Sequence, residues 1–392
     1  MQMDKRLLSG SLALVLAALG LVSGAQRPEA RESTSTGSAA SSSEVALEQR
    51  VDEYLQGEMK MDSVPGLSIM IMRDGKVLLA RGYGFAQLET RLPAKPETVF
   101  ELGSMTKQFT ATAVMMLVEQ GRIKLDDPIT KYLANVPELW GQITVRHLLT
   151  HTSGIEEWTK LSELNEWKKQ FIPHATIVRV LASKPLTFRP GEKHVYCNSN
   201  YYLLGLIIEQ ASGQTYAQFM TEHIFSPLHM NATRISDARP ATALAQGYDR
   251  GGGKVDYIKV FSDGGIVSSA LDLAKWATAF DSEQLLTQES RKQMWTALTL
   301  NDGRRVGYGF GFLVNRDKET GNEIIEHGGF TFGFSNFLTR LPTEKLTVVI
   351  LSNSNKGYAR FYSRGVAALY APWFKTFWAG DELEFRTTHP PK

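Results

Sequence analysis

Strand-forming segments stand at both ends of this chain, and mostly helical segments lie between them. Near the start, "GLSIMIMRDGKVLLARGYG" (66–84) reads as two strands joined by Asp74-Gly75, a dipeptide typical of tight hairpin turns. Towards the end, strand-like runs recur in "YGFGFLVNR", "NEIIEHGG", "GFSNFLTRLP" and "LTVVILSNS". The intervening segments carry apolar residues at three- and four-residue spacing, which indicates helices. This order predicts an α+β fold, in which an antiparallel sheet built from both ends of the chain flanks an inserted helical region.

The first 44 residues are expected to lie outside the folded domain. Residues 1–25 carry Lys5 and Arg6, then an apolar run, then small residues, which is the pattern of a cleaved export signal. The Ser/Thr-rich segment 26–44 lacks apolar periodicity and is predicted to be a disordered linker. The folded domain is expected at 45–376, with its sheet from about 66–100 and 300–376 and its helical region at about 101–299. A tail is expected at 377–392.

Charge and cysteine content exclude several classes of protein. The 43 Lys and Arg residues nearly balance 41 Asp and Glu residues, for a net charge of +2, so nucleic acid is not expected as a partner. The single cysteine, Cys197, excludes an intrachain disulfide framework and a multi-cysteine zinc site. The apolar run of the export signal is short for a membrane span, so no stable membrane insertion is expected after cleavage, and an uncleaved anchor formed by residues 7–25 is the alternative. The expected location is the periplasm or the extracellular space.

A serine and a lysine stand three residues apart where a long apolar helix is predicted to begin. In "FELGSMTKQFTATAVMMLVEQG" (100–121), these are Ser104 and Lys107, and Gly121 is the predicted helix end. A lysine on a buried helix face is unfavourable unless partner groups engage it. Ser-x-x-Lys is a loose pattern that occurs by chance about once or twice in a chain of this length. A capping serine and a solvated lysine explain it equally well.

Two more polar clusters follow later in the chain. Tyr196 and Asn198 precede a predicted helix in "HVYCNSNYYLLG", and His327 and Gly329 stand at a strand end in "EIIEHGGFTFGF". Each has an ordinary structural explanation, since a tyrosine packs, an asparagine caps a helix and glycines allow a bend. The order Ser-x-x-Lys, Tyr-x-Asn and His-x-Gly is much rarer than any of its parts.

With these three motifs the sequence resembles the serine β-lactamases of the class C type and their relatives. These include D-Ala-D-Ala carboxypeptidases, D-amino-acid peptidases and β-lactamase-like esterases. The similarity runs over about residues 45–374 and includes "VPGLSIMIMRDGKV", "ITVRHLLTHTSGI" and "DGGIVSSALDLAKWA". The resemblance implies a β-lactamase/transpeptidase-like fold, with an antiparallel sheet of five or more strands and an active site in the cleft beside the helical region.

The resemblance also implies a role for each motif residue. Ser104 would be the nucleophile and Lys107 its general base, with a pKa lowered by burial. Tyr196 would pass a proton to the leaving group. The backbone N–H groups of Ser104 and Phe330 would form the oxyanion hole. The implied substrate-binding and oxyanion set is Asn198, His327, Gly329 and Phe330.

His327 marks a departure from the β-lactamases, which have Lys-Thr-Gly where this chain has His-Gly-Gly. In that family the lysine helps to hold the carboxylate of the substrate. An imidazole with an ordinary pKa near 6.5 is mostly neutral at pH 7, so it is a weaker anchor for a carboxylate. We therefore expect weak β-lactamase activity and better use of neutral esters or amides.

Other candidate sites have simpler interpretations. His147 and His151 are four residues apart, like a metal-binding pair, but no third ligand is near in the sequence, and helix capping is expected instead. Cys197 is interpreted as a packing residue, because nothing around it suggests a thiol nucleophile. No metal or cofactor is expected.

The sequence therefore predicts an exported serine hydrolase that forms an acyl-enzyme at Ser104. The expected substrate is a D-amino-acid peptide or a small ester. A β-lactamase and a D-Ala-D-Ala carboxypeptidase are the enzymatic alternatives. The non-enzymatic alternative is a penicillin-binding protein that is acylated without turnover. The partner is a small molecule or a peptide, and the oligomeric state is left open.

Overall fold

The computed structural model describes residues 42–168, 172–236, 244–256, 260–356, 358–375 and 377. The predicted export signal, the predicted linker as far as residue 41 and the predicted tail from residue 378 onward lie outside the described residues. Within the described part of the chain, no helix combines the length and the apolar character that crossing a membrane requires.

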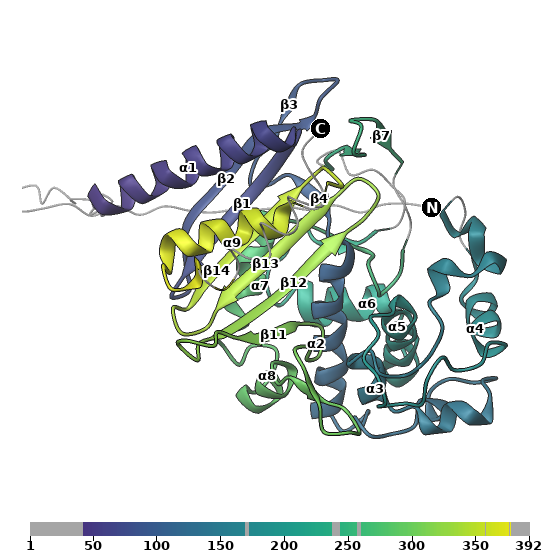
Figure 1. The fold of residues 1–392 in the computed structure, drawn as a ribbon. Helices are drawn as coiled ribbons and strands as arrows, with labels where there is room; N and C mark the ends of the chain where they lie inside the picture. The colour runs from purple at the N-terminus through teal and green to yellow at the C-terminus, as the bar shows by residue number, and fades with distance from the viewer. Residues whose placement is uncertain are drawn as a thin grey trace, which may run out of the picture. The chain divides into compact units, whose positions relative to one another are not determined.

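A seven-stranded antiparallel sheet joins the two ends of the described chain, as predicted (Figure 1). The two halves meet where β14 pairs with β1, and Ile350 lies opposite Ile69 at the centre of that pairing. In spatial order the strands are β11 (Leu313–Arg316), β12 (Glu323–Phe330), β13 (Ser335–Leu341), β14 (Leu346–Ser352), β1 (Gly66–Arg73), β2 (Lys76–Gln87) and β3 (Leu92–Pro93).

The predicted hairpin at Asp74-Gly75 is confirmed. Both residues have positive φ angles, 50° and 72°, between β1 and β2. A two-residue turn of this kind has the twist that matches its flanking strands, and an Asp-Gly pair tolerates the left-handed backbone it needs. The turn thereby sets the register of β1 against β2.

Each face of the sheet is covered by helices. Leu67, Ile69 and Ile71 of β1 pack on the face that carries α1 (Ser42–Asp62) and α9 (Ala359–Tyr370). Figure 1 shows these two helices, from opposite ends of the chain, on the same side of the sheet. The alternate residues of β1 point the other way, since side chains alternate along a strand, and join the larger core of the helical region.

Helix α2 (Thr106–Glu119) is the centre of the helical region. Most of its residues are buried on every side, which is typical of a core helix rather than an amphipathic surface helix. It ends just before Gly121, which has a φ of 71°, as predicted. The remaining helices are α3 (Val145–Leu149), α4 (His174–Ala182), α5 (Asn198–Ser212), α6 (Tyr216–Met220), α7 (Ala270–Thr278) and α8 (Gln288–Met294), with short 3-10 turns η1 (Gly103–Met105), η2 (Ile129–Lys131), η3 (Glu138–Gln142), η4 (Trp158–Lys160) and η5 (Ser162–Lys168) and a π-helical turn η6 (Thr221–Phe225).

Some segments that were expected in the main sheet form short strands elsewhere or begin later in the chain. The strand β4 (Val99–Glu101) does not join the main sheet but pairs with β8 (Ile266–Ser269), which also pairs with β5 (Arg234–Ile235). The predicted strand "YGFGFLVNR" begins only at Leu313, because the N–H of Phe310 turns to the carbonyl of Met294 instead of a neighbouring strand. Two further pairs are β6 (Gly247–Tyr248) with β7 (Lys254–Val255) and β9 (Leu298–Thr299) with β10 (Arg305–Val306).

A buried ion pair ties α9 to the sheet. Glu326 of β12 and Arg364 of α9 are 0% and 1% exposed, and the Nε of Arg364 donates to Glu326 Oε1 at 2.8 Å. The hydroxyl of Thr339 donates to the same oxygen. Loss of one partner from such a pair is strongly unfavourable, because the other charge stays buried.

We expect Arg364→Met to lower the free energy of unfolding by about 3–5 kcal/mol, because the carboxylate of Glu326 would keep only the Thr339 hydroxyl among its partners in the described part of the chain. A urea titration followed by circular dichroism measures this difference. Adding Glu326→Leu should regain most of the lost stability, since no buried charge then remains at the pair. Asp302→Ala breaks a solvent-exposed pair with Arg304 and should leave the free energy of unfolding nearly unchanged. Equal effects of Arg364→Met and Asp302→Ala would contradict the interpretation.

Candidate active site

Ser104 and Lys107 lie on consecutive turns at the start of the core helix. Ser104 belongs to η1 and is partly exposed, whereas Lys107, in the first turn of α2, is fully buried. The Lys107 ammonium donates to Ser104 Oγ at 3.0 Å. It also donates to Asn198 Oδ1 at 2.8 Å and to the backbone carbonyl of Asp263 at 2.7 Å. An ammonium has three N–H donors, and all three are used here, so Lys107 is not the solvated side chain of the alternative interpretation.

Asn198 is the first residue of α5, and its side chain turns towards Lys107 instead of capping the helix. Cys197 occupies the capping position. The backbone N–H of Asn198 donates to Glu157 Oε2 at 2.6 Å. This bond fixes the start of α5 and holds the Asn198 amide beside the lysine.

The Tyr196 ring covers Lys107 from the side of the solvent. The ammonium lies 5.0 Å from the centre of the ring, within the range of a cation–π interaction. The ring packs on the His151 ring at a centroid distance of 4.3 Å with a tilt of 35°, and Tyr196 is 42% exposed. Its hydroxyl makes no hydrogen bond to a described residue. The structure therefore places the ring over Lys107, while the relay through the hydroxyl stays a prediction.

His327 faces into the protein and is bonded there. It is 4% exposed, its Nδ1 contacts the carbonyl of Gly328 at 2.6 Å, and its Nε2 lies 3.2 Å from the hydroxyl of Tyr308. The same hydroxyl lies 3.1 Å from His151 Nε2. Burial, and secondarily the charge of Lys107, lowers the pKa of His327 to about 3. This imidazole is therefore neutral at pH 7, and it can contact a substrate only by giving up one of these bonds.

The chain His151–Tyr308–His327 has a defined direction. The backbone N–H of Cys197 donates to His151 Nδ1 at 3.2 Å, so we assign the His151 proton to Nε2. His151 then donates to the Tyr308 hydroxyl, which donates to His327. Burial also lowers the pKa of His151 well below its usual value. Two neutral histidines thus support the ring of Tyr196 without adding positive charge beside Lys107.

The end of β12 runs tightly against η1, where the oxyanion hole is predicted. A Cβ on Gly329 would lie 1.8 Å from the carbonyl oxygen of Leu102, so only glycine fits there. A Cβ on Gly103 would lie 2.8 Å from the backbone nitrogen of Phe330, and Gly103 has a φ of +55°. The backbones that carry the N–H groups of Ser104 and Phe330 are therefore neighbours. Sequence analysis missed Gly103, and a glycine directly before the serine was the available signal.

A cleft with a cavity volume of about 110 Å³ opens beside Ser104. It lies between η1, η4, the start of α5, the segment before β8 and the residues that follow β12. Two buried carboxyl residues in its wall, Glu101 and Asp263, were not singled out by sequence analysis, although Glu101 stands three residues before Ser104 and Asp263 opens the segment "DGGIVSSALDLAKWA". The lining residues are Glu101, Gly103, Ser104, Thr159, Asn198, Val260, Asp263, Gly264, Phe330, Thr331 and Phe332.

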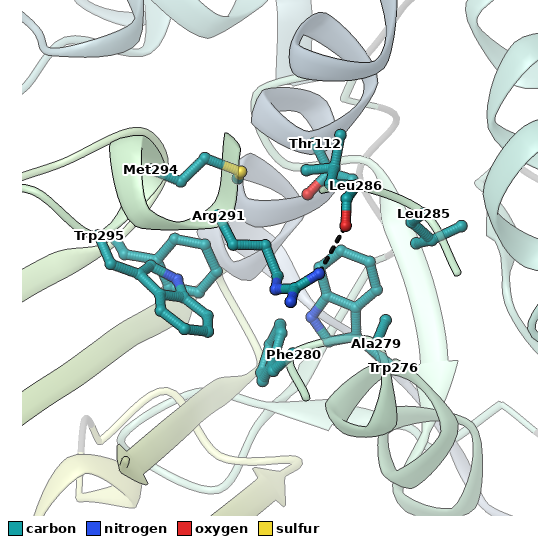
Figure 2. Close-up of a pocket in the computed structure, with 10 residues that line it drawn as sticks. Thr112, Trp276, Ala279, Phe280, Leu285, Leu286, Arg291, Met294 and Trp295 are labelled. Atoms are coloured by element: carbon teal, nitrogen blue, oxygen red, sulfur yellow. Dashed lines mark hydrogen bonds between the residues drawn. The ribbon is translucent and has the colours of Figure 1, made fainter. Parts of the chain in front are cut away.

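A second hollow lies farther along α2 and has a different character (Figure 2). Trp276, Phe280 and Trp295 contribute most of its lining, and the guanidinium of Arg291 is bonded to the carbonyl of Leu286 at 2.5 Å. Figure 2 shows this arginine turned towards that carbonyl among apolar side chains. The lining holds no pairing of a nucleophile with a base, so the cleft beside Ser104 is the candidate active site.

The capping prediction for His147 is confirmed, and so is the packing role of Cys197. His147 Nδ1 accepts from the backbone N–H of Thr144, whose hydroxyl in turn accepts from the backbone N–H of His147. The thiol of Cys197 is buried against the carbonyl of Ile155, and burial raises its pKa to about 12. A thiol with this pKa is a poor nucleophile at neutral pH.

Comparison with known sequences identifies related proteins. The profile of the beta-lactamase family matches residues 51–371. Penicillin-binding protein 4* of Bacillus subtilis (strain 168) is 29% identical over 310 residues, which are 74% of this chain and 68% of that protein. Protein flp of Staphylococcus aureus (strain MW2) is 30% identical over 326 residues, 79% of this chain and 64% of that protein. The chain thus spans less than two thirds of the length of protein flp.

Comparison with solved structures also finds related proteins, among them a penicillin-binding protein homologue and an amidohydrolase. An octameric penicillin-binding protein homologue from Pyrococcus abyssi superposes with a TM-score of 0.74 at 30% identity, over 83% of this chain and 77% of that chain. A D-stereospecific amidohydrolase from Streptomyces sp. superposes with a TM-score of 0.64 at 26% identity, over 80% of this chain and 94% of that chain.

Proposed function

Because this chain belongs to the beta-lactamase family, whose members are serine hydrolases, we propose that Ser104 is its nucleophile and forms an acyl-enzyme with amide or ester substrates. One observation carries the assignment. Lys107 is fully buried, and its ammonium is held 3.0 Å from Ser104 Oγ by the Asn198 side chain and the Asp263 carbonyl. At this distance a proton can pass directly between Ser104 Oγ and the nitrogen of Lys107.

The proposed reaction follows from these positions. Lys107, in its neutral form, accepts the Ser104 proton as Oγ attacks the carbonyl carbon. The backbone N–H groups of Ser104 and Phe330 stabilise the oxyanion. Tyr196 delivers its phenolic proton to the leaving amine or alcohol as the bond from that group to the acyl carbon breaks, and the phenolate then takes up the proton that Lys107 received from Ser104. Water then attacks the acyl-enzyme and gives a proton to the neutral Lys107. That proton returns to Ser104 Oγ as the acid is released.

We assign D-amino-acid peptides or small esters as substrates, ahead of β-lactams. Inward bonding of His327 supports this choice, because the imidazole replaces a cationic lysine and is neutral. The similarity to a D-stereospecific amidohydrolase supports it as well. A β-lactamase or a D-Ala-D-Ala carboxypeptidase remains the second candidate. The segment 1–25 supports export to the periplasm or the extracellular space.

A substrate panel tests the proposal. We expect steady hydrolysis of p-nitrophenyl acetate and of a D-alanine p-nitroanilide, with slower turnover of nitrocefin and of a D-Ala-D-Ala peptide at equal enzyme concentration. Fast turnover of nitrocefin would favour the β-lactamase. A burst of one product equivalent without turnover on every substrate would identify a penicillin-binding protein that stalls as an acyl-enzyme.

A further inference from the structure

The cleft beside Ser104 has more acidic than basic side chains in its wall. Two carboxyl groups line it, those of Glu101 and Asp263, and no arginine or lysine is among the lining residues that the structure describes. The nearest described cation is Lys107, whose three N–H bonds go to Ser104, Asn198 and a backbone carbonyl. None of these bonds reaches a carboxyl oxygen of the wall, although the charge of Lys107 opposes part of the rise in the pKa of Asp263.

Glu101 is held rigidly at the end of β4. Its strand pairs with β8, and its backbone carbonyl accepts from the Asn336 side chain at 2.7 Å. The residue is 6% exposed, and no described Lys, Arg or His forms an ion pair with its carboxyl group. Burial raises its pKa to about 8, which the Thr331 hydroxyl opposes only in part. A carboxyl group in this position is poised for a cation that the described residues do not supply.

Asp263 also lines the cleft, and one of its carboxyl oxygens has no hydrogen-bond partner among the described residues. Its Oδ2 accepts from the indole N–H of Trp158 at 3.2 Å, while Oδ1 has no hydrogen-bond partner among the described residues. The residue is 4% exposed, and burial raises its pKa to about 6. Buried polar atoms are seldom left unsatisfied unless a ligand or water completes them. Glu157, the remaining acidic neighbour, is already engaged by the backbone N–H of Asn198.

We propose that this cleft binds a primary ammonium group on the acyl part of the substrate, with Glu101 as its main partner and Asp263 as the second. The substrates would be amides or peptides whose acyl residue carries a free amine, so that the enzyme removes an amino-terminal residue. The inference rests on the proposed function, because the acyl group is defined by attack of Ser104. A substrate with a carboxylate on its acyl part would meet two acidic groups and would be disfavoured.

The expected preference follows from the strength of a charge-assisted hydrogen bond. Such a bond between a desolvated carboxylate and an ammonium corresponds to roughly 10- to 150-fold in kcat/KM. The bound ammonium favours the ionised form of Glu101, so the pair forms at neutral pH. N-acetylation removes the charge and should remove this advantage.

The test compares each free-amine substrate with its N-acetyl derivative. The probes are the p-nitroanilides of D-alanine and of 4-aminobutyric acid, which place the ammonium at two distances from the carbonyl. We expect the wild-type kcat/KM of at least one free-amine substrate to exceed that of its acetylated form by tenfold or more. In Glu101→Gln this ratio should fall at least tenfold, and in Asp263→Asn it should fall less. Glu138→Gln, which changes an exposed glutamate of η3, should keep the wild-type ratio.

The outcomes separate this inference from the proposed function. Hydrolysis of p-nitrophenyl acetate by the wild type, with no preference for either free amine, would overturn the inference and leave the hydrolase assignment standing. A preference that survives Glu101→Gln would also overturn it. Failure of the wild type to hydrolyse any ester or anilide would remove the proposed function and the inference together. The wild-type ratio decides the question by itself if Glu101→Gln does not fold.

Discussion

Ser104→Ala is expected to abolish turnover of every substrate and all covalent labelling by a fluorophosphonate probe. The reason is that Ser104 Oγ is the attacking atom in the proposed reaction. The fold should persist, because Lys107 keeps its bonds to Asn198 and to the Asp263 carbonyl after the oxygen is removed. Intact-protein mass spectrometry after probe treatment measures the label, and thermal unfolding measures the fold.

Ser183→Ala is the matched control for this experiment. Ser183 follows α4, is exposed and lies outside the cleft lining, so its loss should leave labelling at the wild-type level. Labelling of Ser104→Ala at another serine would show that the nucleophile was misassigned. An unlabelled but unfolded Ser104→Ala would instead call for Ser104→Cys, in which the probe should label the thiol.

The parts of the fold that could be predicted from the sequence are those whose neighbouring residues have a recognisable pattern. Asp74-Gly75 identifies its turn because few residues tolerate two consecutive positive φ angles. A short, continuous apolar run in β1 and a longer run of small and apolar residues in α2 identify their own elements in the same way. A single sheet built from both ends of the chain was predicted because both ends had the same strand pattern, whereas the pairing of β1 with β14 within that sheet was not predicted.

The short strands gave no such signal. The strand β4 has three residues and β8 has four, too few for a period to be visible. Their pairing nevertheless fixes Glu101 in the wall of the cleft. Elements of this size are set by tertiary contacts, and sequence patterns do not report those contacts.

In the candidate site, too, some features were predictable from the sequence and others required the fold. The motif residues Ser104, Lys107 and Asn198 were predicted together, and the structure joins them by hydrogen bonds of 2.8–3.0 Å. The inward bonding of His327 was not predicted, since it depends on Tyr308 and on a histidine more than 150 residues away. Spacing along the chain identifies groups on one helical turn, whereas a hydrogen-bonded chain across three segments requires the fold.

The hydrogen bonds of Lys107 make its burial tolerable. Its ammonium would be unfavourable in a core helix, but three acceptors from three different segments meet there, and the Tyr196 ring covers the remaining side. The same contacts that make burial tolerable also aim the nitrogen at Ser104. The same hydrogen bonds therefore allow Lys107 to be buried and position its nitrogen for catalysis.

Lys107→Met is accordingly expected to lower the rate of acylation by roughly 10²–10⁴-fold, the usual range for loss of a general base. Methionine nearly fills the space of the lysine stem but offers no nitrogen, so Ser104 Oγ would keep its proton. The measurement is the single-turnover rate of labelling by a fluorophosphonate probe, with thermal unfolding to confirm the fold. Lys124→Met removes an exposed lysine beyond the end of α2 and should label at the wild-type rate. If folded Lys107→Met were labelled at a rate within tenfold of the wild type, the base would have to be another group. Tyr196 would then be the first residue to test by substitution.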